Sequence, residues 1–237
     1  MIRFENVGFS YDGKRQILKD ISFEIDDNAS VGLIGANGAG KSTLIRSVLG
    51  FLDFSGKITV DGTEVTKKTL PEIRKKIGYV MQNSDNQMFM PRVVDDMSFG
   101  PRNYGMDREK TGEKIDEILE RLSISHLKEA YNHRLSGGEK KMASIATILT
   151  MEPSILIMDE PTSMLDPYNR RKIQEVINSL PQTKLIASHD LDFICDTCEK
   201  SILLYDGEIR GYDLTERIMR DRDLLEGCHL ELPYRYQ

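Results

Sequence analysis

The sequence contains no tryptophan, only three cysteines and no apolar run of the length that crosses a membrane. A transmembrane helix needs about 20 consecutive apolar residues, so the pattern argues against an integral membrane protein. Three cysteines leave one unpaired in any disulfide scheme, which favours a reducing compartment. Because no signal-peptide pattern precedes the first strand-like segment, we expect a soluble, cytoplasmic protein.

The chain has no excess of positive charge, because its 38 acidic residues outnumber its 32 lysines and arginines. The formal net charge is −6 and the pI is about 5.4. The densest basic run, Arg74–Lys76, is not interleaved with aromatic residues and is typical of a solvated helix face. A nucleic-acid partner is therefore not expected. Cys195 and Cys198 form a C-x-x-C pair without a second pair at zinc spacing, so we expect ordinary core or surface thiols.

The hydrophobic pattern predicts one α/β domain over residues 1–237. Alternating residues in 1–27, and a short strand over Lys57–Val60, favour an antiparallel β layer. A brief helix is expected over Leu70–Lys76 and a buried strand over Ile77–Gln82. Residues 85–144 show mainly helical spacing and predict an inserted helical subdomain. After Ile145 the apolar runs SILIMDE, KLIASHD and SILLYDG return, as in parallel strands covered on both faces.

A glycine-rich loop lies between an apolar run and an amphipathic segment in residues 31–49. It matches the pattern G-x-x-x-x-G-K-[ST] at Gly35, Gly40, Lys41 and Ser42. Glycines let successive backbone N–H groups turn inward as an anion nest. Lys41 adds a charge for the outer phosphates, and the Ser42 hydroxyl suits Mg²⁺. The loop residues expected to bind a nucleotide are Gly35, Asn37, Gly38, Ala39, Gly40, Lys41, Ser42 and Thr43.

Two acids end the apolar run ILIMDE, at Asp159 and Glu160. Ligands of open α/β sheets collect at the carboxyl ends of the strands. Beside a phosphate loop, Asp159 is placed to hold Mg²⁺ together with Ser42. Glu160 lies one residue further and could deprotonate the water that attacks the γ-phosphate.

A third element, LSGGE at residues 135–139, starts another helical pattern with exposed N–H groups and predicts a second phosphate-binding surface. Together with the phosphate loop, the paired acids and His189 after a later strand, it resembles the ATP-binding cassette (ABC) family over nearly the whole chain. The resemblance implies a P-loop NTPase of ABC type with a RecA-like parallel-sheet core. It also implies ATP hydrolysis with Mg²⁺.

The resemblance assigns further roles. Tyr11 matches the aromatic residue that stacks on adenine, and Gln82 matches the glutamine that senses Mg²⁺ and the γ-phosphate. His189 matches the histidine that contacts the γ-phosphate, whereas we expect His126, His133 and His229 to be structural or surface residues. The catalytic group expected is thus Glu160, His189 and Gln82, and the metal group is Ser42, Gln82 and Asp159.

In the family, the LSGGE-type signature of one subunit closes over the nucleotide of another. The residues expected to face a partner's nucleotide are Ser136, Gly137, Gly138, Glu139 and Asp166. Glu139 stands where glutamine is common and loses the amide's donor capacity, and Met164 is bulkier than the usual residue. A head-to-tail homodimer or a heterodimer with a related ATPase is expected.

Residues 78–105 are similar to the ATPases of energy-coupling factor (ECF) importers, including the cobalt and nickel type, through a Q-N-x-D-x-Q-x-F run and F-G-P-x-N-x-G. Ser84 replaces a frequent proline. The resemblance implies a peripheral subunit on the cytoplasmic face of the membrane. A transmembrane coupling subunit is expected to contact about Gln87–Arg102, with Met88, Phe89, Met90 and Pro91 as candidates, and a substrate-binding membrane subunit to be contacted indirectly.

Three alternatives share the nucleotide residues. The chain could serve another ABC importer or an exporter. A cassette ATPase acting on nucleic acid or ribosomes should carry a long coiled-coil insertion, a second cassette or a basic patch, which the sequence does not show. A catalytically silent scaffold should lack residues such as Glu160 and His189.

Overall fold

The structure is a computed structural model that describes residues 1–237. An antiparallel sheet forms one layer, with strands in the order β2-β1-β4-β5. Its strands are β1 (Ile2–Ser10), β2 (Gln16–Ile25), β4 (Ser55–Val60) and β5 (Thr63–Glu64). Phe4 and Phe23 stack across β1 and β2 with ring centroids 4.5 Å apart, which seals the layer toward the core. The N-terminal β layer predicted from alternation is confirmed.

A second sheet forms the centre of the molecule, in the order β10-β9-β3-β8-β7-β6. Its strands are β3 (Ser30–Ile34), β6 (Ile77–Val80), β7 (Ile155–Asp159), β8 (Thr183–Ala187), β9 (Lys200–Tyr205) and β10 (Glu208–Leu214). All neighbours are parallel except β10, which returns antiparallel to β9. The loops after β3, β6, β7 and β8 therefore open at one edge, where ligands of such sheets bind.

Both faces of the central sheet are buried. Alternate residues such as Leu33, Ile157 and Leu185 pack against α1 and the antiparallel layer. Their neighbours, such as Ile34 and Leu156, pack against the helices on the opposite face. Because β7 and β8 are covered on both faces, every residue in them is buried, and β9 is partly exposed only at its two ends, as the continuous apolar runs predicted.

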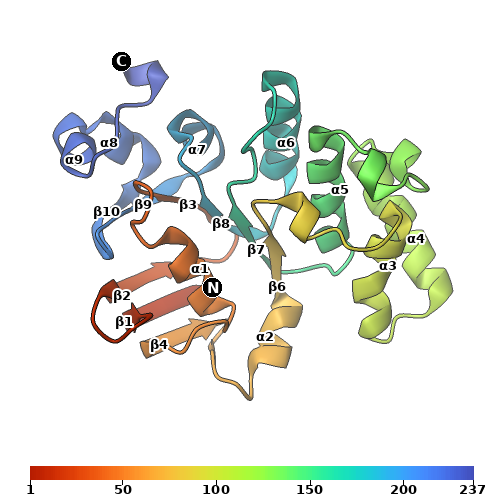
Figure 1. The fold of residues 1–237 in the computed structure, drawn as a ribbon, viewed down its shortest axis with the longest axis horizontal. Coiled ribbons are helices and arrows are strands. Elements are labelled where there is room, and N and C mark those ends of the chain that lie inside the picture. Colours follow the sequence, from red (N-terminus) through yellow and green to blue (C-terminus); the bar gives the residue numbers. More distant parts are fainter.

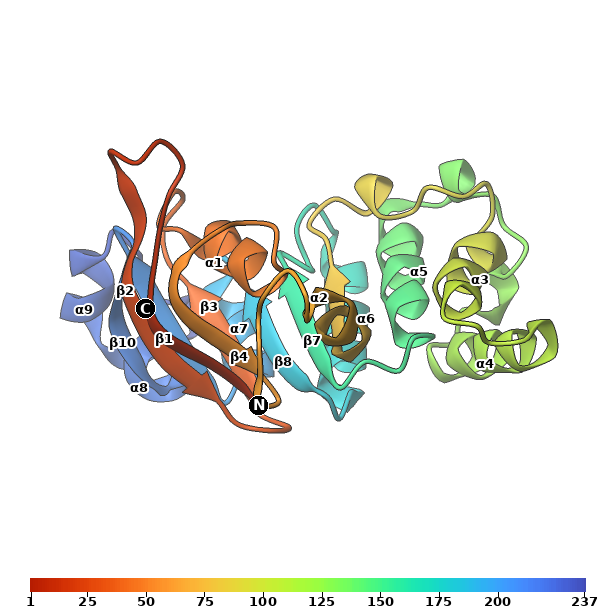
Figure 2. The same cartoon turned by 90° about the horizontal axis from the view of Figure 1, so that it is seen from below.

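Figures 1 and 2 show that the inserted helices extend from one end of the sheet, with the antiparallel layer toward the other end. The helices are α1 (Lys41–Val48), α2 (Leu70–Lys76), α3 (Val93–Asn103), α4 (Arg108–Arg121), α5 (Gly137–Leu149), α6 (Pro167–Ser179), α7 (Leu191–Thr197), α8 (Thr215–Arg220) and α9 (Arg222–Gly227). Short 3₁₀ turns are η1 (Ser84–Asn86), η2 (Ser125–Leu127), η3 (Asn132–Arg134) and η4 (Tyr234–Tyr236). None of the helices is long and apolar enough to span a membrane.

Two boundaries differ from the expectation. The insert was expected to end near residue 144, but α5 runs through that point to Leu149. Ile145, Ala146 and Leu149 are buried in the core that includes the central sheet, which keeps the helix continuous. The strand expected over Ile77–Gln82 stops at Val80. That residues 85–144 form a helical subdomain inserted in the α/β core stays a prediction.

Candidate active site

A cavity of about 680 Å³ opens at the carboxyl edge of the central sheet. Most of the residues expected at a nucleotide site line it. They are Gly35, Asn37, Gly38, Gly40, Lys41, Ser42, Thr43, Gln82, Asp159, Glu160 and His189. Six separate segments of the chain line this cavity, so the fold brings together polar and charged groups that are far apart in the sequence.

The phosphate loop connects β3 to α1 through strained backbone that only glycine tolerates well. Gly35 has φ +153°, and a Cβ there would lie 2.2 Å from the carbonyl oxygen of Leu204. Gly40, just before α1, has φ +111°. Ala39 is the exception among the expected loop residues, because its side chain is buried in the core rather than lining the cavity. The loop thus approaches the end of β9 closely.

Lys41 is buried at the base of this loop. Its Nζ donates to the carbonyl oxygens of Gly35 at 2.6 Å and Ala36 at 3.3 Å. Burial lowers the pKa of Lys41, and the carboxylates of Glu160 and Asp159 partly oppose that shift. An anion entering the cavity would supply the charge partner that the buried ammonium lacks at hydrogen-bond distance.

Ser42 and Asp159 meet across the cavity floor, with the Ser42 hydroxyl 3.3 Å from Asp159 Oδ2. Burial raises the pKa of Asp159, while the Ser42 hydrogen bond and the Lys41 charge act in the opposite direction. A hydroxyl and one carboxylate, with the amide of Gln82 in the same cavity, are hard oxygen donors. Mg²⁺ prefers such a sparse set and completes its shell with water and substrate phosphates. The residues present therefore fit a magnesium ion.

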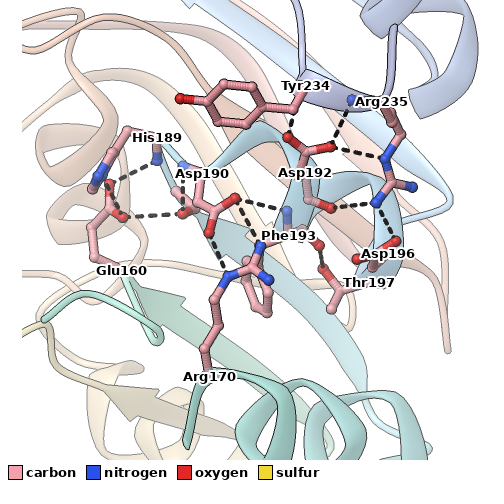
Figure 3. Close-up of polar contacts among 11 residues, drawn as sticks. Glu160, Arg170, His189, Asp190, Asp192, Phe193, Asp196, Thr197, Tyr234 and Arg235 are labelled. Carbon is pink, nitrogen blue, oxygen red and sulfur yellow. Dashed lines mark hydrogen bonds and ion pairs between the residues drawn. The ribbon is translucent and has the colours of Figure 1, made fainter. Parts of the chain in front are cut away.

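Glu160 follows β7 in a left-handed conformation, with φ +47°. Its carboxylate accepts two hydrogen bonds from the loop after β8, from Ser188 Oγ at 3.0 Å and from the His189 N–H at 3.0 Å, and its Oε2 lies 2.9 Å from His189 Nδ1. Figure 3 shows His189 lying directly against Glu160. Such strain at a non-glycine residue is typical of functional sites. The structure therefore pairs the two residues that we expected to act on the γ-phosphate.

Comparison with known proteins now decides the family. The ABC transporter family model matches residues 18–163, more than half of the chain. A putative ABC transporter ATP-binding protein of Geobacter sulfurreducens is 42% identical over 96% of this chain and 92% of its own length. The chain belongs to the ABC transporter family. As an ABC ATPase it binds ATP and has the ATP-hydrolysing activity general to that family.

The expected similarity to ECF and cobalt-type subunits is also confirmed. An energy-coupling factor transporter ATP-binding protein of Methanoculleus marisnigri is 37% identical, over 94% of this chain and 82% of its own. The solved structure of CbiO1 from Clostridium perfringens, described as part of the ABC transporter complex CbiONQ, superposes with a TM-score of 0.86. It shares 32% identity and covers 95% of this chain and 93% of its own. The expected ABC fold is confirmed with it.

The signature residues of this ABC ATPase lie outside the nucleotide cavity. Gly137 lines a different cavity of about 620 Å³ and starts α5. Ser136 and Glu139 form a capping box: the Glu139 N–H donates to Ser136 Oγ, and Glu139 Oε2 accepts from the Ser136 N–H at 2.9 Å. A hydrogen bond from the Ser136 hydroxyl to Glu139 Oε2 at 2.7 Å, and then that from the Ser136 N–H, lower the pKa of Glu139. A carboxylate suits this position because capping needs only an acceptor.

Tyr11 and Asp166 line neither the nucleotide cavity nor the cavity at the start of α5. The Tyr11 hydroxyl is 3.5 Å from Thr43 Oγ1, and its ring is 60% exposed beside the phosphate loop. Asp166 caps α6 by accepting from the N–H groups of Tyr168 and Asn169. Met164 is fully exposed, with a backbone φ of +61°, so its large side chain projects into solvent.

The segment expected to meet a membrane partner is only partly exposed. Met88 is buried, but Phe89 is 62% exposed and packs edge-on against the exposed Phe99, with centroids 4.9 Å apart. Gln87 serves the fold instead: it accepts from the Met81 N–H at 3.0 Å and donates to the Ser144 carbonyl at 2.7 Å. Of the four candidates Met88, Phe89, Met90 and Pro91, only Phe89 and Pro91 are exposed, whereas Met90 is partly buried.

Besides Ile17 and Ala36, sequence reasoning missed two residues near the end of the chain that line the nucleotide cavity, His229 and Leu230. They come from the C-terminal segment, which carries no motif, and His229 packs edge-on against Tyr205 at 5.4 Å. The histidine was expected to be structural or merely at the surface. Cys195 and Cys198 do not form part of any cluster of metal-binding side chains. Burial raises the pKa of each thiol to about 11.

Proposed function

We propose that this chain is the ATPase subunit of an ECF-type importer of a vitamin or metal ion, and that its nucleotide cavity is one half of a composite active site. One observation carries the proposal: the catalytic and phosphate-loop residues share a cavity, whereas the signature at the start of α5 lines another. The second phosphate-binding surface therefore has no phosphate loop of its own chain to serve. A second ATPase subunit would bring one.

At the nucleotide, the loop N–H groups and the positive end of α1 bind the phosphates, and Lys41 neutralises the outer ones. Ser42 and Asp159 would hold Mg²⁺, with Gln82 beside them, and the ion would supply charge neutralisation at the phosphates. Tyr11 stacks on adenine at the rim. These assignments are supported by the shared cavity and by the 3.3 Å contact between Ser42 and Asp159.

Glu160 acts as the general base that takes a proton from the attacking water. His189 orients Glu160 and reaches the γ-phosphate. Two observations support these roles: the two hydrogen bonds and the close His189 Nδ1 contact onto the Glu160 carboxylate, and the position of both side chains in the cavity. The hydrogen bonds also restrict the carboxylate to a small range of orientations, which is what a positioned base requires.

A head-to-tail dimer completes the site. The signature residues Ser136, Gly137, Gly138 and Glu139 of one subunit, with its Asp166 loop, then face the ATP held by the other. ATP contacts both subunits only in the closed dimer, so its binding favours closure and its hydrolysis favours opening. Whether the second subunit is a copy of this chain or a related ATPase is decided by the purification described below.

The membrane partner docks on the inserted helices, at the exposed Phe89 and Phe99 pair. Paired exposed aromatics are typical of binding surfaces. CbiO1, the similar structure described above, is itself described as part of a transporter complex. We therefore place this chain at the cytoplasmic face of a membrane as a peripheral subunit, with a substrate-binding membrane subunit reached through the coupling subunit.

The test is purification of the tagged chain from detergent-solubilised membranes, followed by identification of its partners and a phosphate-release assay. We expect a transmembrane coupling subunit, a substrate-binding membrane subunit and Mg²⁺-dependent ATP hydrolysis. Recovery with ribosomes and without membrane proteins would refute the transport assignment. Recovery with exporter subunits would retain the ATPase and refute the importer.

A further inference from the structure

Two acids in the first turn of α7 are held by arginines from two other parts of the chain. Asp190, the N-cap of α7, pairs with Arg170 of α6, and Asp192 pairs with Arg235 of the C-terminal segment (Figure 3). None of these four residues lines the nucleotide cavity. All lie beyond residues 18–163, which the family model matches. His189 immediately precedes this turn, so the arginines hold the backbone that carries it.

The Arg170 contact is bidentate. Its Nε donates to Asp190 Oδ2 at 2.7 Å and its Nη2 to Asp190 Oδ1 at 3.0 Å. The Asp190 N–H donates to Ser188 Oγ at 3.1 Å, and Ser188 in turn donates to Glu160. Only one fully buried hydroxyl separates this pair from the Glu160 carboxylate. A change in Asp190 therefore shifts a hydrogen-bond donor of Glu160.

Arg235 bridges two turns of the same helix. Its Nε donates to Asp192 Oδ1 at 2.9 Å and its Nη2 to Asp196 Oδ1 at 2.5 Å. The Tyr234 N–H adds a hydrogen bond to Asp192 Oδ2 at 2.9 Å. Behind it, Tyr236 lies under the guanidinium of Arg220, 4.5 Å from the ring centroid. The C-terminal segment is thus attached to α7 by charge-assisted hydrogen bonds and fixed at its end by a cation–π contact.

These ion pairs are less exposed to solvent and have closer contacts than an ordinary surface salt bridge. The Asp192 side chain is 22% exposed and that of Arg235 is 35% exposed. For comparison, Arg222 and Glu226 of α9 are 61% and 58% exposed, and their single contact is 3.5 Å long. Solvent screens the exposed pair strongly, whereas planar guanidinium contacts with half-buried carboxylates impose a definite geometry.

We propose that Arg170 and Arg235 are positioning residues for ATP hydrolysis, which hold the first turn of α7 and through it the contact of His189 with Glu160. The inference rests on the proposed function of these two residues. It also gives the C-terminal segment a role at the nucleotide site, because His229 and Leu230 of the same segment line the cavity. The C-terminal segment, to which the sequence analysis gave no role, thereby connects the wall of the nucleotide cavity with the loop that carries His189.

The kinetic test compares Arg235→Met with the control Arg222→Met in the purified transporter complex. We expect Arg235→Met to lower kcat about tenfold, since small displacements of a positioned group have effects of that order, while KM for ATP stays nearly constant. Arg222→Met should retain wild-type values. Arg235→Lys should recover part of kcat, because a single ammonium can pair with one of the two carboxylates. The double variant Arg235→Met, Asp192→Asn should have a kcat only slightly lower than that of Arg235→Met alone.

A second readout does not depend on hydrolysis. NMR of the full chain labelled at histidine gives one resonance for each of the four histidines, and His189→Gln assigns that of His189. We expect Arg235→Met and Arg170→Met to shift the His189 resonance and to leave those of His126 and His133 in place. An unchanged His189 resonance with wild-type kcat in Arg235→Met would overturn the inference. An inactive wild-type complex would instead refute the proposed function, and the NMR result would still decide whether the arginines hold His189.

Discussion

Replacing Glu160 by glutamine separates the proposed general base from its structural role. The carboxylate accepts from the His189 N–H through Oε1 and from Ser188 Oγ through Oε2, which also lies 2.9 Å from His189 Nδ1. A glutamine can keep its oxygen toward the N–H group and turn its NH₂ toward the serine oxygen and an unprotonated ring nitrogen, both of which can accept. The Glu160→Gln chain should therefore fold and bind ATP like the wild type, but it cannot take a proton from water.

The expected loss is that of a general base, roughly 10²- to 10⁴-fold in turnover, or about 2.7 to 5.5 kcal/mol in activation free energy. Phosphate release by the purified complex measures turnover, and a fluorescent ATP analogue measures binding separately. Thermal unfolding serves as the control for folding. Turnover within a factor of about three of the wild type would be far too fast for a missing general base and would refute the assignment of Glu160.

Three further outcomes are expected. Burial lowers the pKa of Lys141 to about 8, so between about pH 8 and 10 the unfolded chain, with an ordinary lysine, binds more protons than the folded one. The free-energy penalty of burying the charged lysine therefore disappears as pH rises through this window. Urea unfolding should show the stability of the wild type rising by roughly 2 to 3 kcal/mol relative to that of Lys141→Met. A stability difference between the two chains that does not change with pH would contradict this. The buried Cys198 thiol, with its pKa near 11, should be alkylated by iodoacetamide roughly 10²-fold more slowly in the folded chain than in urea, and equal rates would show that the thiol is accessible. Phe89→Asp should reduce recovery of the membrane partner about tenfold with little change in stability, whereas Phe51→Asp, at a site that is also about 60% exposed, should not; equal recovery in both variants would place the docking surface elsewhere.

Much of the site could be predicted because each motif follows a parallel strand. The loop after β3, the acids after β7 and His189 after β8 are local patterns, and the topology brings their strand ends to one edge. Two further features had readable signals that were missed. Ser136-x-x-Glu139 has capping-box spacing. Asp206-Gly207, both at positive φ between β9 and β10, is a hairpin signal that predicts the antiparallel edge strand.

The contacts around α7 could not be predicted in this way. Arg235 pairs with an acid 43 positions away, and nothing local distinguishes Asp192 from the other acids among the 38 in the chain. The same holds for His229 and Leu230, whose place in the nucleotide cavity depends on how the last residues pack across α7. Long-range ion pairs are set by tertiary packing, whereas hydrophobic period and turn chemistry act over a few residues.

The most direct test of the composite site is the mass of the Glu160→Gln assembly with and without ATP and Mg²⁺. A Cβ at Gly137 would meet no atom within 4 Å, so Gly137→Arg should fold while covering the phosphate-binding surface at the start of α5. Sedimentation of the chain with its co-purified ATPase partner, or alone if none is found, should show ATP-dependent pairing of two ATPase subunits that Gly137→Arg weakens strongly. Tight ATP binding without pairing, or pairing unaffected by Gly137→Arg, would contradict a site shared between two subunits.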